Sequence, residues 1–229
     1  MDKTHFEESE KTWDKIANSF DKTRKKPWEI CLNFIKSQDK NSVFADLGCG
    51  NGRHLIPAAK HFKKAIGVDI SSNLLHIVEN KIKKLNINNL ELIHSTLTKI
   101  PLKDNSIDSI LFIASLHNIK HRKNRLKALR ETKRIIKKDG SAMISVWSRE
   151  QDKFRELFNK NKIDKNQEFG DINIFWRQDK LDVPRFYHLY SEKEFKEDIN
   201  NAGLKIVNFQ PVKLVSKNYY DNYFATVKN

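Results

Sequence analysis

The chain has 229 residues, of which 43 are Lys or Arg and 29 are Asp or Glu, so its formal net charge at pH 7 is +14. This length suits one α/β domain with a sizeable core, and we expect a single domain over residues 1–229. No apolar stretch approaches the ~20 residues of a membrane span, and the charged N-terminal segment is unlike a signal peptide. We therefore expect a soluble, cytoplasmic protein with no membrane partner, and the positive charge favours a polyanionic one.

The two cysteines, Cys31 and Cys49, are too few for a disulfide framework or a four-ligand zinc site. We expect both to be reduced thiols, and we predict no metal site.

The first 40 residues carry two helical patterns. Pro27 starts the second, because proline is favoured in the first turn of a helix. We expect residues 1–40 to form a helical lid beside the core. The apolar positions at helical spacing are Trp13, Ile16, Ala17 and Phe20 in the first helix and Trp28, Cys31, Phe34 and Ile35 in the second.

Strand and helix patterns alternate from Ser42 onward. Such alternation predicts an α/β fold with a mainly parallel, doubly wound sheet, right-handed crossovers and helices on both faces. Two further strands near 203–209 and 219–227 complete seven. The other predicted strands are 43–48, 65–69, 90–94, 107–113 and 141–147, and the predicted helices are 53–62, 73–85 and 123–137.

A glycine-rich loop follows the first strand and reads Gly48-x-Gly50-x-Gly52, with Asp46 two residues ahead of it. Glycines allow a ligand to approach the backbone closely, and the following helix N-terminus offers unpaired N–H donors. The spacing differs from the G-x-G-x-x-G of dinucleotide sites, and the acid suits the cationic S-adenosylmethionine better than a pyrophosphate. A tight strand–helix turn is the alternative interpretation.

Asp69 ends the second strand, twenty-one positions after Gly48 (69 − 48). An acid at the end of this strand can accept hydrogen bonds from both ribose hydroxyls. A solvated strand-end aspartate is the alternative, but together with the loop Asp69 indicates a nucleoside cofactor.

The strand 107–113 leads to His117, at the sheet edge where the reactive group of a cofactor would lie. His117 is a candidate substrate contact, or else a histidine that only caps the strand end. Ala114 and Leu116 are expected to pass near the cofactor.

Seven segments, spread over nearly the whole chain, carry a resemblance to a known family. They are residues 13–20 (WDKIANSF), 23–28 (TRKKPW), 46–52 (DLGCGNG), 146–151 (VWSREQ), 185–190 (RFYHLY), 192–194 (EKE) and 221–224 (DNYF). In these segments the chain resembles the tRNA wobble-uridine carboxymethyl methyltransferases, class I S-adenosylmethionine-dependent enzymes that esterify 5-carboxymethyluridine in the anticodon.

The resemblance implies S-adenosyl-L-methionine as cofactor and the tRNA anticodon loop as substrate. Three departures stand out: Thr96 occupies the place of an aspartate that accepts the adenine amino group, Asn118 replaces the second of paired histidines, and the long polar insertion of some eukaryotic members is missing. The cofactor contacts so implied are Asp46, Gly48, Cys49, Gly50, Asn51, Asp69, Ile70, Thr96, Ala114 and Leu116.

The substrate side of the predicted site draws on residues 148–201, which we expect to form a substrate-side insertion. A carboxymethyl group has a pKa near ~4 and is already ionised at neutral pH, so the enzyme needs no general base. Arginine suits its recognition through a bidentate fork. The residues assigned to substrate are Arg24 and Arg185, for carboxylate or phosphate, Tyr187 and His188, for the uridine pocket, and His117.

Trp28 and Trp147 are candidates to stack on an unpaired base, although Trp147 suits a core position equally well. The basic helix near 122–138 is either a solvated face or a phosphate-contacting one.

The resemblance also implies a partner, a small zinc-ribbon activator that would pair with an exposed sheet edge at residues 90–94. Two other functions stay open on the sequence. One is methylation of a small metabolite such as a quinone precursor, and the other is a catalytically weakened scaffold, which the departure at Thr96 encourages.

Overall fold

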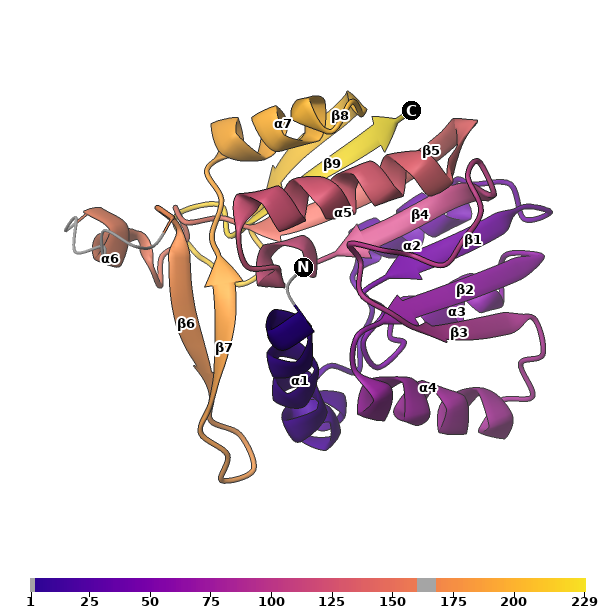
Figure 1. Cartoon of the computed structure of the whole chain (residues 1–229), viewed down its shortest axis with the longest axis horizontal. Helices are drawn as coiled ribbons and strands as arrows, with labels where there is room; N and C mark the ends of the chain where they lie inside the picture. Colours follow the sequence, from indigo (N-terminus) through magenta and orange to yellow (C-terminus); the bar gives the residue numbers. More distant parts are fainter. Residues whose placement is uncertain (1–2, 160–167) are drawn as a thin grey trace.

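The computed structural model describes residues 3–159 and 168–229 (Figure 1). Residues 160–167, which belong to the predicted insertion 148–201, and residues 1–2 lie outside the described part. No helix in the described part is both long and apolar enough to cross a membrane.

Seven strands form one sheet in the order β3-β2-β1-β4-β5-β9-β8. The first five are parallel, and β9 runs antiparallel to β5 and β8. The central strands are nearly continuous apolar runs because helices cover both of their faces. The strands are β1 (Val43–Leu47), β2 (Lys64–Asp69), β3 (Leu90–His94), β4 (Ile107–Ile113), β5 (Ile136–Trp147), β8 (Lys205–Val212) and β9 (Asn222–Lys228).

Helices cover both faces of the sheet (Figure 1). α2 and α3 pack on one face, and α5 and α7 on the other. The predicted fold class, a mainly parallel seven-stranded sheet with helices on both faces, is therefore confirmed. The helices are α1 (Lys3–Thr23), α2 (Glu29–Lys36), α3 (Leu55–Ala59), α4 (Ser72–Lys84), α5 (Arg122–Ile135), α6 (Arg155–Asn159) and α7 (Glu192–Asn201), with a short 3-10 helix, η1 (Leu116–Asn118).

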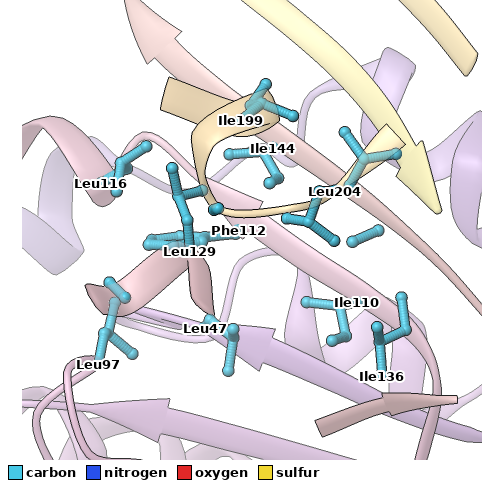
Figure 2. Close-up of a cluster of buried hydrophobic side chains, with 14 of the residues drawn as sticks. Leu47, Leu97, Ile110, Phe112, Leu116, Leu129, Ile136, Ile144, Ile199 and Leu204 are labelled. Carbon is cyan, nitrogen blue, oxygen red and sulfur yellow. The ribbon is translucent and has the colours of Figure 1, made fainter. Parts of the chain in front are cut away.

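The larger core cluster joins the sheet to α5 and α7 (Figure 2). Phe112 of β4 and Leu129 of α5 are fully buried within it, and so is Leu116 of η1. Each such side chain contributes roughly 1.5–3 kcal/mol by leaving water. This core fixes the end of β4 and the short helix after it, which border the site.

Some predicted boundaries shift. The helix predicted over 53–62 spans only Leu55–Ala59. After it the chain turns toward β2, and the Asn89 side-chain amide donates hydrogen bonds to the carbonyls of Ala59 and Phe62. The second helix starts at Glu29, two residues after Pro27.

Residues 148–201 contain a hairpin that lies outside the main sheet. Its antiparallel strands are β6 (Asp171–Trp176) and β7 (Val183–His188). Asp179 and Lys180 in its tip both have positive φ, as a type I′ turn requires. In Figure 1 α1 lies between β7 and α4, and it contacts both. The hairpin and α1 thus flank the carboxyl ends of the parallel strands.

Candidate functional site

A pocket opens at the carboxyl ends of β1, β2 and β4, with α1, η1 and β7 around it. This is where open α/β sheets bind their ligands. The predicted site residues that line this pocket are Arg24, Gly48, Cys49, Gly50, Asn51, Asp69, Ile70, Thr96, Ala114, His117, Arg185 and Tyr187. The candidate stacking residues Trp28 and Trp147 line it too.

The glycine loop has the close backbone packing that its sequence predicts. Gly48 has a φ of +74°, and a Cβ there would fall 2.2 Å from Oγ of Ser115. The backbone N–H groups of Gly48 and Cys49 both donate to the carbonyl of Val68, at 2.7 and 3.1 Å. The loop is therefore held against β2 with its surface open to the pocket.

Asp69 fixes the loop from the end of β2. One carboxylate oxygen accepts the Gly50 N–H at 2.7 Å, and the other accepts the Ser71 N–H at 2.9 Å. Burial raises the pKa of Asp69, while these backbone hydrogen bonds oppose the shift. A carboxylate has about four lone-pair sites, so Asp69 keeps acceptor capacity for a ligand hydroxyl.

Three predicted residues do not line the pocket. Asp46 lies behind the glycine loop, 2% exposed, because it belongs to a buried strand. Leu116 points into the core cluster of Figure 2. His188 is fully buried on the face of β7 opposite to Tyr187, since successive strand residues alternate. The structure therefore does not bring these three side chains to the pocket, and ligand contacts by them stay predictions.

His117 lines the part of the pocket next to β7 in a fixed protonation state. Its Nδ1 accepts the backbone N–H of Trp147 at 3.1 Å, which assigns the proton of the neutral ring to Nε2. Burial, with the positive charges of His188 and Arg185, lowers the pKa of His117 to about 3. The ring stacks on Tyr187, with centroids 5.1 Å apart, and so offers a neutral N–H donor rather than a base.

Arg185 is the most unusual group of the pocket. It is 6% exposed, lies 4.9 Å from the Trp176 ring and donates from Nη1 to the Tyr187 hydroxyl at 2.6 Å. Its Nε is buried without a partner, and no described carboxylate lies within 4.0 Å of the guanidinium. Burial lowers its pKa, yet arginine stays charged at neutral pH. A buried cation without a counter-ion indicates a site for an anion.

Arg24 and Arg53 place two further guanidiniums at the pocket. Arg24 lies over the rings of Trp176 and Phe20, and Arg53 lies 4.4 Å from the centre of the Trp28 ring. Burial lowers the pKa of Arg53 to about 10. Sequence reasoning missed Arg53, although its place directly after the glycine loop was an available signal.

Asp69 is the only acidic residue among the described residues that line this pocket. The half that holds His117, Tyr187 and Arg185 therefore presents hydrogen-bond donors and aromatic rings, with no carboxylate to act as a base. Such a site can hold an anion and exclude water from it, but it has little means to remove a proton from a neutral nucleophile.

Comparison with known proteins agrees with this architecture. Residues 45–144 match the family described as "Methyltransferase domain". A solved complex of the Haloferax volcanii Trm112 methyltransferase activator with a methyltransferase has the same fold, with a TM-score of 0.71, 14% identity, and 96% of each chain covered. With the strand order and the glycine loop, these matches show that the chain has the fold of class I S-adenosylmethionine-dependent methyltransferases.

The sequence relatives are more specific. The chain is 29% identical over 215 residues to the tRNA (carboxymethyluridine(34)-5-O)-methyltransferase of Schizosaccharomyces pombe, covering 85% of this chain and 87% of that protein. It is 33% identical over 152 residues to the alkbh8 enzyme of the same name from Xenopus tropicalis, covering 66% of this chain. The chain spans only 22% of the length of that second protein.

Proposed function

We propose that this protein transfers a methyl group from S-adenosylmethionine to the carboxylate of a 5-carboxymethyl group on the wobble uridine of tRNA, which forms the methyl ester. The observation that carries the proposal is the buried guanidinium of Arg185, in a pocket half lined by donors and aromatic rings. The names of the sequence relatives supply the nucleoside and its position in tRNA.

The chemistry fits a site without a base. The acceptor carboxyl group, with a pKa near ~4, is ionised at neutral pH, so its oxygen can attack without losing a proton. The new bond joins that oxygen to the methyl carbon. The bond between this carbon and the sulfonium sulfur would break, and its electrons would stay on sulfur. What the protein supplies is orientation and exclusion of water.

Arg185 would hold the acceptor carboxylate, and the Nε2–H of His117 would donate to a second substrate oxygen. The stacked rings of Tyr187, His117 and Trp147 would provide a wall for the unstacked uracil. The Tyr187 hydroxyl accepts from Arg185 and thereby fixes the guanidinium.

The cofactor end of the pocket fits S-adenosylmethionine, which when bound supplies an electrophilic methyl group. Asp69 would accept the ribose hydroxyls. The glycine loop, where Ser115 leaves no room for a Cβ at Gly48, would lie against the cofactor. Thr96 lies at the pocket where an adenine amino group would need an acceptor.

The direct test is incubation of the purified protein with S-adenosylmethionine and tRNA that bears 5-carboxymethyluridine, followed by digestion and mass analysis of the nucleosides. The expected product is one methylene heavier and reverts on mild alkali. An unchanged nucleoside, with cofactor bound, would contradict the tRNA assignment and favour a small-metabolite acceptor. Failure to bind cofactor would favour a scaffold.

We further propose that a small zinc-ribbon activator pairs with β3, and that the protein acts in the cytoplasm. β3 is the terminal strand of the sheet, and its apolar residues Leu90, Leu92 and Ile93 are only half-buried. A strand added there would satisfy open backbone groups and cover these side chains. We expect the activator to co-purify with the wild-type protein and with Val207→Lys, a control at an exposed position. Loss of co-purification in Leu92→Lys would support pairing at this edge.

A further inference from the structure

His188 lies behind the pocket, in a contact that the ligand-binding role does not explain. Its Nδ1 lies 2.8 Å from Oδ1 of Asp171, and its Nε2 lies 2.8 Å from Oε1 of Glu194. A neutral imidazole has one donor and one acceptor, and a carboxylate only accepts. Two carboxylate partners therefore require the doubly protonated, cationic ring.

The two carboxylates come from different elements. Asp171 is the register partner of His188 on β6, whereas Glu194 lies in the first turn of α7. The Ser191 side chain accepts the Glu194 N–H at 3.2 Å and fixes that turn. His188 thus links both strands of the hairpin to a helix that packs on the main sheet.

Two arginines offset the negative charge of carboxylates near His188. Arg149 lies 3.6 Å from Glu194, and Arg125 of α5 pairs with Glu168 at 2.6 Å. Tyr190 meets the His188 ring edge-on with centroids 4.7 Å apart. Burial lowers the pKa of His188, but the hydrogen bonds to Asp171 and Glu194 outweigh burial and raise it above its ordinary value.

The same strand carries the substrate side chains. Arg185 and Tyr187 point from β7 into the pocket, and His188 follows on the opposite face. The hairpin forms its own two-stranded sheet. Two backbone hydrogen bonds join Tyr190, just after β7, to Trp147 and Arg149 at the end of β5, and His188 adds a side-chain link from the hairpin to α7.

We propose that His188 is a positioning residue: as an imidazolium it clamps the β6–β7 hairpin to α7 and so holds Arg185 and Tyr187 at the substrate. The clamp itself follows from the contacts, whereas its effect on substrate rests on the proposed function. The charge, rather than the ring alone, is what the clamp needs.

The first test measures backbone hydrogen exchange in the hairpin and needs no tRNA. His188→Gln and Glu194→Gln should each speed exchange of the β6 and β7 amides about tenfold or more, while β1 and β4 are unchanged. Glu131→Gln is the matched control, because Glu131 is also a paired helical carboxylate, 17% exposed against 21% for Glu194. Wild-type protection of the hairpin in His188→Gln would overturn the clamp.

The second test separates positioning from general stability. His188→Gln should raise KM for tRNA about tenfold or more, with the dissociation constant of S-adenosylmethionine unchanged within twofold. An equal loss of cofactor and tRNA binding would overturn the positioning role. If the hairpin loosens but wild-type protein methylates no tRNA, the proposed function fails and the clamp stands.

The third test uses unaltered protein, so it holds even if His188→Gln does not fold. A group with a raised folded-state pKa stabilises the fold at low pH and loses that contribution as the pH rises through its folded pKa. The NMR titration of the His188 ring should therefore have its midpoint above ~6.5, and hairpin protection should fall across it. A midpoint below this value would overturn the proposal.

Discussion

Arg185 is the residue on which the proposed chemistry depends. Its guanidinium is buried against Trp176 and Tyr187, and its pKa is lowered because burial penalises the charge. A protein keeps such a group at a cost of several kcal/mol unless a ligand compensates it. An anionic acceptor supplies that compensation at the moment of binding.

Replacement of Arg185 by Lys should lower kcat/KM for tRNA about tenfold or more, because the charge stays but the bidentate fork is lost. Arg185→Met should cost on the order of 10²- to 10³-fold, as for other preorganised donors in water-excluded sites. Arg130→Lys, at an exposed position on α5, is the matched control and should leave kcat/KM for tRNA unchanged. Steady-state kinetics that show full activity in Arg185→Lys would remove the bidentate role.

Asp46 gives a prediction on pH. Burial, and then the charge of Asp69, raise the pKa of Asp46 to about 7, so it gains its negative charge only as the pH rises through neutrality. Because that charge lies just behind the loop that would bind the cationic cofactor, affinity for S-adenosylmethionine should increase from pH 6 to pH 8. Calorimetric titration should find this increase abolished in Asp46→Asn. A pH dependence that is the same in the variant would place the titrating group elsewhere.

At the scale of elements, the side chain of Asp14 joins α1 to the start of α4. Asp14 accepts hydrogen bonds from the Ser71 hydroxyl at 2.6 Å and the Asn73 N–H at 3.0 Å, at the start of α4. The carboxylate thereby satisfies unpaired groups at a helix N-terminus, where negative charge is favoured. This contact ties the helix that carries Trp13 and Phe20 to the cofactor side of the site.

Asp14→Ala should loosen α1, since a charged hydrogen bond contributes about 1.5–3 kcal/mol. We expect roughly tenfold weaker cofactor binding by calorimetry and faster amide exchange in α1, whereas exposed Glu7→Ala on the same helix should behave as wild type. Unchanged exchange in α1 would show that Asp14 is dispensable for docking the helix.

The sequence predicts the elements whose patterns are local and misses those set by distant partners. Alternating apolar runs give the central sheet, and the glycine loop with Asp69 gives the cofactor end of the pocket. The partners of Asp14 lie 57 or more residues away in the chain, so no local sequence pattern predicts them. Had 183–188 been interpreted as a strand, its period of two would have placed Tyr187 and His188 on opposite faces.

At the scale of the molecule, the basic residues behind the net charge of +14 have different roles. Several arginines of the basic helix α5 have acidic partners: Arg122 with Asp198, Arg125 with Glu168, and Arg134 with Glu131 and Asp104. These pairs hold α5 to its neighbours and favour a structural role for them. The exposed lysines beside Arg24 are better placed to meet phosphates near the pocket.

The double variant Lys25→Gln, Lys26→Gln should weaken tRNA binding and reduce the slope of log affinity against log salt by about one to two, because each phosphate contact releases counterions. Lys123→Gln, Lys127→Gln on α5 is the charge-matched control and should have the smaller effect. Filter binding over a salt series measures both. A larger loss in the control would assign tRNA docking to the basic helix.

The most direct test of the account compares two acceptors that differ only in charge. Single-turnover methyl transfer should be measured on tRNA that carries 5-carboxymethyluridine and on tRNA that carries its neutral carbamoylmethyl counterpart. A pocket built around Arg185 without a base predicts rapid formation of an alkali-labile methyl ester on the first and no transfer to the second. Methylation of the neutral acceptor at a comparable rate would contradict the central claim.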